Sequence, residues 1–398
     1  MLIAKCPRPL FSLLFMTESV FQMLCKETIM KLTIKYKRVY FVFWAVLLLS
    51  YTLSVSNICA QVPGIGYISF ASNRTGNFDI YLIDTNGENL RSLTNHPADE
   101  RAPTWSPDGR FLAYVSNRDG DSKIYVMDTR TEEHRQLTNR HEGEWTPAWS
   151  PDGEWIAFVS GSHEIVPPVK FKKTRHIYKT DVNGGHPVQL TDQGQNLNPA
   201  WSPDGKWIVF DSYHRGDDRE GIYVMDANGR RLKRLNDQNL RAFNGTFQSE
   251  CAWSSDGKQI AFSIFAPRND RMHLGVIDVD GKNFRQLTQE GPIVKPVDPA
   301  IKFVNPIMKF PLPQIREPAW SPNGRWIAYV YSDAVFGATT DIYVIDAEGN
   351  RRGKPLVTDG GKDLSPAWVP EGFLSVSPSA EKQPTLWGRL KQEANTMK

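Results

Sequence analysis

The chain has 398 residues, of which 40% are hydrophobic and 23% are charged, a composition typical of a soluble protein with a packed core. Residues 1–60 contain seven Lys and Arg and two Glu, a net charge of +5, so the total of +3 leaves −2 for the rest of the chain. A near-neutral body argues against a nucleic-acid-binding protein, which usually presents a basic surface.

Residues 1–60 predict an export signal or a membrane anchor. Basic residues between positions 31 and 38 precede an apolar run at 39–53, which small residues follow up to Ala60. This order is that of a secretory signal cleaved after Ala60; the alternative is a retained anchor, although the run is short for a membrane span. A leader that begins at Met30 is more conventional than one that begins at Met1. If translation starts at Met30, residues 1–29 are not part of the protein. Both alternatives export the body to the periplasm or the cell exterior.

A repeat dominates the rest of the chain. Its first element reads Pro-Ala-Trp-Ser-Pro-Asp-Gly in its most regular form, and its Trp recurs at spacings of 44, 52, 52, 67 and 48 residues. The motif tryptophans are Trp105, Trp149, Trp201, Trp253, Trp320 and Trp368. Repetition at this period predicts one repeat architecture rather than several unrelated domains.

Each unit reads as four antiparallel strands. Strand one carries the Trp and ends at a Pro-Asp-Gly turn, for which Pro and Gly supply the required backbone angles. Strand two alternates, as in residues 155–159, and strand three has the form Ile-Tyr-Leu-Ile-Asp of residues 80–84. Strand four ends in Leu-Thr, as at Leu137. Four-stranded units of this length are typical of propeller blades.

The two ends of the body complement each other. It opens at residues 67–70 with strands two to four and no Trp strand, and it closes with the Trp strand of Trp368 alone. We therefore predict an all-β, six-bladed β-propeller over residues 61–374, whose ring is closed where the last Trp strand joins the first blade. Such closure removes free sheet edges.

The repeat resembles that of the TolB-type (WD40-like) propeller family, whose units read PAWSPDG, SNRDG, IYVMD and LT. Residues 116–120 (SNRDG) and 72–76 (SNRTG) carry the likeness, which covers about residues 65–374. The resemblance implies a protein-binding scaffold. Translocation proteins of this family carry a mixed α/β domain ahead of the propeller, and the present sequence leaves no room for one between the leader and the first blade.

Antiparallel connection places two sets of loops at opposite ends of the blades. One set consists of short turns, whereas the other holds long connections, including residues 163–175, 212–221, 239–248, 290–316 and 332–341. Because loops usually carry function, we expect the partner-binding surface on the elaborated face, at the mouth of the central channel. The residues that enter the Trp strands there are Glu100, Arg101, Glu144, Asn198, Glu250, Arg316, Glu317 and Asp363. Ordinary solvated channel lining is the alternative.

The connection at residues 290–316 is too apolar for a merely solvated loop and suggests an interface or a plug. Phe303, Ile307 and Phe310 are its candidate partner contacts. The tail, residues 375–398, has Leu386 and Trp387 among charges and forms either a short amphipathic helix or a disordered end.

No catalytic apparatus is predicted. A Gly-x-Ser-x-Gly nucleophile elbow is absent from the sequence, and Cys251, the single cysteine beyond residue 60, cannot form an intramolecular disulfide in the body. His96, His141, His163 and His214 fall in loops of the elaborated face, but none shows paired metal-ligand spacing. We therefore expect no catalytic residue, no metal and no cofactor.

The sequence thus predicts an exported, monomeric scaffold that binds an envelope protein or peptide, and no nucleic acid. It meets the membrane only through an uncleaved leader. The alternative function is a channel-centred, metal-dependent lyase or hydrolase, or a carbohydrate-binding propeller.

Overall fold

The chain divides into two compact units, Met1–Gln61 and Val62–Lys398, and the fold described below belongs to the second. The computed structural model describes residues 66–140, 142–166, 170–213, 221–235, 248–266, 271–288, 314–332, 340–349, 355–357, 361–371 and 373. The predicted leader, the tail and residues 290–313 of the predicted apolar connection lie outside these residues. The predicted connection runs to Arg316, but residues 314–316 already belong to a strand, Gln314–Trp320. Within the described part of the chain, no helix has the length and apolar character needed to span a bilayer.

The first two sheets show the predicted four-stranded antiparallel unit. Sheet A has the strand order β23-β1-β2-β3, and sheet B the order β4-β5-β6-β7. The strands of sheet A are β1 (Tyr67–Ser72), β2 (Asp79–Asp84), β3 (Arg91–Ser92) and β23 (Asp363–Trp368). Those of sheet B are β4 (Glu100–Trp105), β5 (Phe111–Ser116), β6 (Lys123–Asp128) and β7 (Glu133–Gln136). The last strand of the chain therefore pairs with the first, with Ile68 opposite Trp368.

Sheet C holds two such units, which we name C1 and C2. A single parallel pair, Arg175 with Gln195, joins them into one sheet of eight strands. C1 consists of β8 (Gly143–Trp149), β9 (Trp155–Val166), β10 (Lys170–Asp181) and β11 (Val188–Gln189). C2 consists of β12 (Gln195–Trp201), β13 (Trp207–Tyr213), β14 (Gly221–Asp226) and β15 (Lys233–Arg234).

Sheets D and E complete the described strands. Sheet D has four strands, and sheet E has three among the described residues. Sheet D consists of β16 (Gln248–Trp253), β17 (Gln259–Ala266), β18 (Arg271–Asp278) and β19 (Arg285–Gln286). Sheet E consists of β20 (Gln314–Trp320), β21 (Trp326–Ser332) and β22 (Thr340–Asp346).

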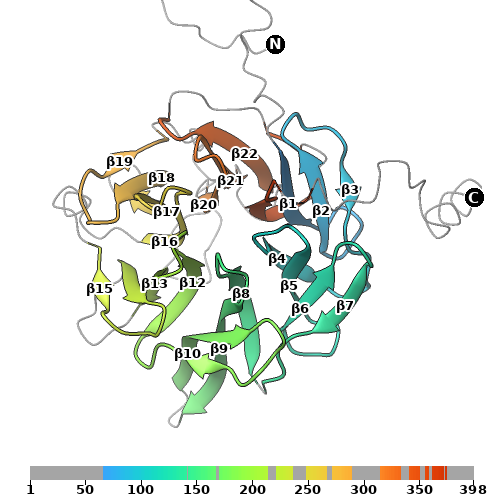
Figure 1. The fold of residues 1–398 in the computed structure, drawn as a ribbon, viewed down its shortest axis with the longest axis horizontal. Coiled ribbons are helices and arrows are strands. Elements are labelled where there is room, and N and C mark those ends of the chain that lie inside the picture. Colours follow the sequence, from blue (N-terminus) through green and yellow to red (C-terminus); the bar gives the residue numbers. More distant parts are fainter. Residues whose placement is uncertain are drawn as a thin grey trace, which may run out of the picture. The chain divides into compact units, whose positions relative to one another are not determined.

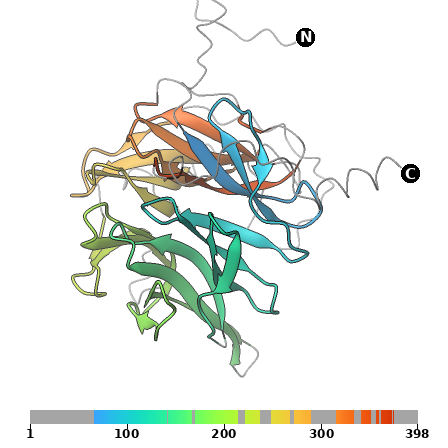
Figure 2. The ribbon, with the colours of Figure 1, turned by 45° about the vertical axis from the view of Figure 1, so that its right-hand side comes forward.

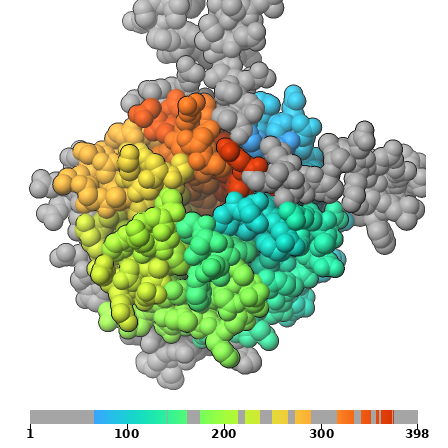
Figure 3. Space-filling view, in the orientation of Figure 1, coloured from blue at the N-terminus to red at the C-terminus, as the bar shows by residue number. Residues whose placement is uncertain are grey.

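The sheets lie around a common centre, with β4, β8, β12, β16 and β20 innermost and β3, β7, β15 and β19 outermost (Figure 1). Figure 2 shows that neighbouring sheets pack face to face. In Figure 3 the colours follow the sequence around the face, and sheet E reaches the neighbourhood of sheet A.

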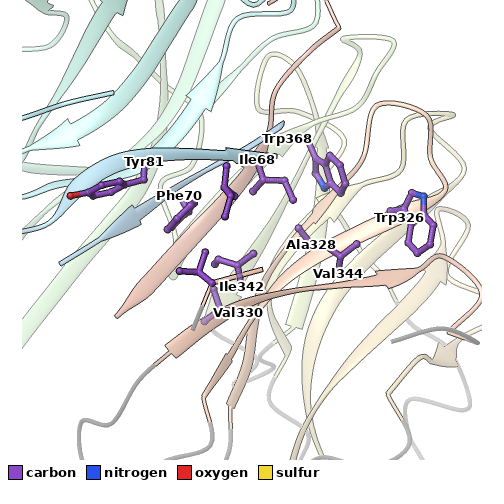
Figure 4. Packing of buried hydrophobic residues seen from close by; sticks show 11 residues of the cluster. Ile68, Phe70, Tyr81, Trp326, Ala328, Val330, Ile342, Val344 and Trp368 are labelled. Atoms are coloured by element: carbon purple, nitrogen blue, oxygen red, sulfur yellow. The ribbon is translucent and has the colours of Figure 1, made fainter. Parts of the chain in front are cut away.

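Buried apolar side chains hold successive sheets together. Six clusters lie between A and B, B and C1, C1 and C2, C2 and D, D and E, and E and A. In the E–A cluster, Trp368 and Ile68 of sheet A lie opposite Val344 of sheet E (Figure 4). Alternation in strands two and three points their apolar side chains toward both neighbouring sheets, so removal of this surface from water stabilises each interface.

Most motif tryptophans tie one sheet to the one before it. The indole N–H of Trp105 donates to Ser69 Oγ over 2.8 Å, and that of Trp253 donates to the Ala200 carbonyl over 3.1 Å. Trp201 and Trp368 make the equivalent bonds to Ala148 and Ala319. These residues therefore pack and link the sheets.

Every Trp strand contains a β-bulge at the same place. The pairing register shifts three residues before the Trp in each of them. The residues at that point all have a positive φ between 47° and 56°, and they are Ala102, Thr146, Asn198, Glu250, Glu317 and Ser365. None is glycine, so each bulge places a strained residue on an innermost strand, and packing on both sides must hold it there.

Candidate functional site

The inner strands form the candidate site because the residues expected at the channel mouth lie on them. They contact one another in the order β4, β8, β12, β16, β20 and β23, and β23 contacts β4. Side chains near the bulges of neighbouring inner strands are therefore close enough to interact from sheet to sheet.

Two of the predicted residues are buried acids that pair with the arginine of the Ser-Asn-Arg motif. Glu100 is fully buried, and its Oε1 accepts hydrogen bonds from Ser116 Oγ at 2.9 Å and from Arg118 Nη2 at 3.1 Å. Asp363 pairs with Arg74 in the same way at 3.1 Å. The guanidinium of Arg118 also lies over the Tyr125 ring, 4.5 Å from its centroid. These pairs fasten the loop after strand two to the inner strand.

Burial dominates the electrostatics of Glu100. It raises the pKa of this carboxyl to about 7, against the opposing effects of the Ser116 hydrogen bond and the Arg118 charge. Glu144, at the equivalent place in β8, is also fully buried and hydrogen-bonds Thr138 Oγ1. Burial raises its pKa as well, while Thr138 and the charge of Lys123 oppose the shift. Near neutral pH the Glu100 carboxyl therefore takes up a proton easily.

A hydrogen-bonded belt runs along the bulges of four inner strands. Asn198 Nδ2 donates to Asp211 Oδ1 over 2.9 Å, and the backbone N–H of Glu250 donates to the same oxygen over 3.2 Å. Glu250 Oε2 in turn accepts from the N–H of Glu317 over 2.9 Å. Glu317 Oε2 accepts from the N–H of Ser365. The belt links C2, D, E and A through one carboxylate per step.

The belt brings several acidic side chains together where water has little access. Burial raises the pKa of Asp211, which is fully buried. Burial, followed by the negative charge of Glu317, raises the pKa of Glu250 to about 8, and the positive charge of Arg316 opposes this shift. A protonated Glu250 relieves the repulsion from its neighbours. Within the described residues, Nε of Arg316 is buried without a hydrogen-bond partner.

The predicted site residues therefore fall into groups. The belt brings together Asn198, Glu250 and Glu317, with Arg316 beside them, and all four are partly exposed. Arg101 is separate: it pairs with Asp99 at 3.0 Å and lies over the Phe78 ring. The acids Glu100, Glu144 and Asp363 are buried inside the fold. Phe303, Ile307 and Phe310 lie outside the described residues, and partner binding by any of these residues stays a prediction.

Sequence reasoning missed two features of the site. It missed Asp211, which lies on strand two rather than strand one and accepts two bonds of the belt. It also missed Arg74 and Arg118 as partners of the buried acids. A signal for these two pairs exists in the sequence, because Arg74 and Arg118 each stand in a Ser-Asn-Arg motif after strand two, and Asp363 and Glu100 each stand five residues before the motif Trp of the same sheet.

The part of the chain that the structure describes holds no group of three or more His, Cys, Asp or Glu side chains placed to hold a metal ion. Of the four histidines noted in the sequence, only the side chain of His96 is among those described.

Four-stranded antiparallel sheets packed around a common centre, with a Trp strand innermost in each, define a β-propeller. Comparison with known families makes the assignment specific. The family model described as the TolB beta propeller domain matches residues 57–174 and 162–303, and the chain belongs to that family.

Relatives of known name agree with this assignment. The Tol-Pal system protein TolB of Anaeromyxobacter dehalogenans is 34% identical over 118 residues, which is 29% of this chain and 25% of the relative. The matched segment thus spans about a quarter of that protein.

Solved structures show the same fold. TolB from Acinetobacter baumannii superposes with a TM-score of 0.59 at 23% identity, covering 77% of this chain and 67% of the other. A putative TolB from Agrobacterium tumefaciens has a TM-score of 0.53 at 21% identity and covers 74% of this chain and 90% of the other.

Proposed function

We propose that the chain is an exported, non-catalytic scaffold of the cell envelope that binds a protein or peptide at the channel mouth of a closed, six-bladed propeller. Closure is supported by the pairing of β23 with β1, by the apolar cluster between sheets E and A, and by the contact of β23 with β4. In a closed ring every sheet packs against a neighbour on both faces, so the inner strands are held rigidly.

The relatives support a binding role in the envelope. The matched proteins are named as components of a Tol-Pal system, and the leader in residues 1–60 carries the order of an export signal. If that leader directs export as its sequence predicts, the body of the protein is located in the periplasm or outside the cell.

The belt of Asn198, Glu250 and Glu317 is the single structural observation that carries the proposal. Its partly exposed acids are held by hydrogen bonds between neighbouring sheets, so little conformational freedom is lost when a partner binds. Carboxyl groups in this poorly solvated place favour a partner with amide or basic groups, because such groups can hydrogen-bond a protonated or an ionised carboxyl.

In-cell crosslinking of the tagged protein, followed by mass spectrometry, tests the proposal. We expect one envelope protein to be captured by the wild type and lost from a variant lacking residues 296–312 and from Glu317→Gln. Glu154→Gln, an exposed substitution at a Pro-Asp-Gly turn, is the matched control and keeps the partner. Capture of no protein, or capture that neither change at the elaborated face reduces, contradicts the proposal.

A further inference from the structure

An open groove separates C2 from D on the side of the short Pro-Asp-Gly turns. Its volume is about 700 Å³, within the usual range of ligand pockets. Trp207 and Trp253 form its two aromatic walls and are both partly exposed, while Val224 and Leu235 lie beneath them. The two indole rings are thus left partly uncovered at this groove.

The repeat provides an internal comparison between this groove and the one between sheets A and B. Strand pairing fixes the equivalence, since Tyr67 lies opposite Asp84 as Trp207 lies opposite Asp226. The equivalent positions are Tyr67 and Trp207, Leu82 and Val224, Arg91 and Lys233, Leu93 and Leu235, Trp105 and Trp253, and Gly109 and Gly257. Both grooves therefore have aromatic walls, an aliphatic floor and a basic residue at the rim.

The A–B groove is filled by the chain itself. Phe373 is 4% exposed there, with its ring 5.0 Å from that of Trp105 and 6.5 Å from that of Tyr67. The guanidinium of Arg91 lies 5.9 Å from the same ring. A Cβ at Gly109 would come within 2.6 Å of the Phe373 backbone nitrogen, so the absent side chain makes room for the occupant.

The C2–D groove lacks that occupant for a reason visible in the sequence. Phe373 stands five residues after its motif Trp, and the residue five after Trp201 is Lys206. Lys206 is 75% exposed and pairs with Asp204 at 3.4 Å, so it does not cover the groove.

The charges at the groove favour a bound peptide that has an acidic residue next to its aromatic side chain. The rim acids Asp204, Asp256 and Asp280 each have a lysine within 4 Å, and Arg231 lies 4.0 Å from Asp226, so the exposed Lys233 adds positive charge at the rim. In the filled groove the residue two before Phe373 is Glu371, which is exposed.

We propose that the C2–D groove binds an aromatic side chain of a partner peptide that carries an acidic residue beside it, as Phe373 with Glu371 fills the groove between A and B. The aromatic ring packs between Trp207 and Trp253, edge to face as Phe373 does against Tyr67 and Trp105. Lys233 takes the place that Arg91 has over Phe373. This groove is separate from the channel mouth. An experiment can therefore contradict the proposal for one surface and leave the proposal for the other intact.

Titration of the full-length protein with a synthetic peptide tests the inference. The probe is Val-Pro-Glu-Gly-Phe-Leu-Ser-Val, the sequence of residues 369–376. Because the A–B groove is already filled, we expect one equivalent to bind and to shift the tryptophan fluorescence. Replacing the peptide Phe by Ala should weaken binding about 30-fold or more, the usual cost of losing an aromatic anchor.

Two Trp variants form a matched pair. Trp207→Ala should weaken binding by a similar factor, whereas Trp155→Ala, at the equivalent position of C1, should leave it unchanged. Trp155 is already covered by Lys179, whose Nζ lies 4.7 Å from its ring centroid. Thermal unfolding of both variants shows whether they remain folded.

Several results overturn the inference. They are a peptide that does not bind, binding that Trp207→Ala leaves intact, and equal binding of the Phe-to-Ala peptide. A self-association of the peptide-free protein that Trp207→Ala abolishes would assign the groove to a second copy of the chain, and so would also overturn it.

Discussion

The backbone N–H of Glu317 donates a hydrogen bond of 2.9 Å to Oε2 of Glu250, and thereby joins the inner strand of sheet E to that of sheet D. Both residues occupy the bulge of their strand, with φ of 54° and 56°. The same bulge that strains each backbone aims its N–H at the preceding carboxylate. The belt is therefore a consequence of the repeat, although its residues differ from unit to unit.

Protonation of Glu250 should couple pH to stability. Burial and Glu317 raise its pKa in the folded protein to about 8, well above the unfolded value, so its contribution to stability is full below the unfolded pKa and is lost as pH rises toward 8. Glu250→Gln imitates the protonated form and removes this dependence. We expect the variant to gain about 2 °C or more in Tm relative to wild type between pH 5.5 and pH 8.5. A constant difference in Tm across that range contradicts the assignment.

Removal of Arg118 should leave a buried acid without its partner. Arg118→Leu is expected to lower the free energy of unfolding at pH 8 by about 3 kcal/mol, measured by urea denaturation. The loss should be smaller at pH 5, because burial raises the pKa of Glu100 to about 7 and the acid then takes up a proton. Adding Glu100→Gln to the variant should restore part of the stability at pH 8. A double variant no more stable than Arg118→Leu would argue against the pairing.

The indole hydrogen bond between sheets can be isolated with two conservative substitutions. Trp105→Phe loses the 2.8 Å bond to Ser69, whereas Trp149→Phe loses none within the described residues, where Nε1 of Trp149 has no partner. Trp105→Phe should therefore cost about 1 kcal/mol more than Trp149→Phe in chemical denaturation. Equal losses would mean that only packing matters.

Addition of divalent metals distinguishes a scaffold function from the alternative of a metal-dependent lyase or hydrolase. Millimolar calcium, manganese or zinc should leave the Tm of the purified protein unchanged, because the proposed site binds through hydrogen bonds and charge rather than through a metal. A rise of about 2 °C or more that a chelator reverses would instead favour a metal site.

The strands were predictable because each has a local signature. The alternating run 155–159 opens β9, and the motif Trp149 ends β8 as expected. The bulges were not predictable, since Thr146 and Ala102 are poor candidates for a positive φ, and only the pairing of whole strands imposes it. The burial of Glu100 was not predictable either. Its place in the sequence suggests a channel residue, but in the structure it is buried in an ion pair with Arg118.

The groove between sheets A and B, which Phe373 fills, was only partly predictable from the sequence. The corresponding positions in other units hold charged residues, such as Lys206, so the aromatic substitution was visible in the sequence. Its meaning was not, because the groove that it fills is formed by Tyr67 and Trp105, which are far from it in the chain.

Site-specific photo-crosslinking in cells tests the central claim most directly. A crosslinking amino acid would replace Arg316 beside the belt in one variant and Glu154 at a short turn in another. The scaffold account predicts a single protein adduct from position 316 and none from position 154. Absence of an adduct at 316, or the same adducts from both positions, would contradict a partner-binding surface at the channel mouth.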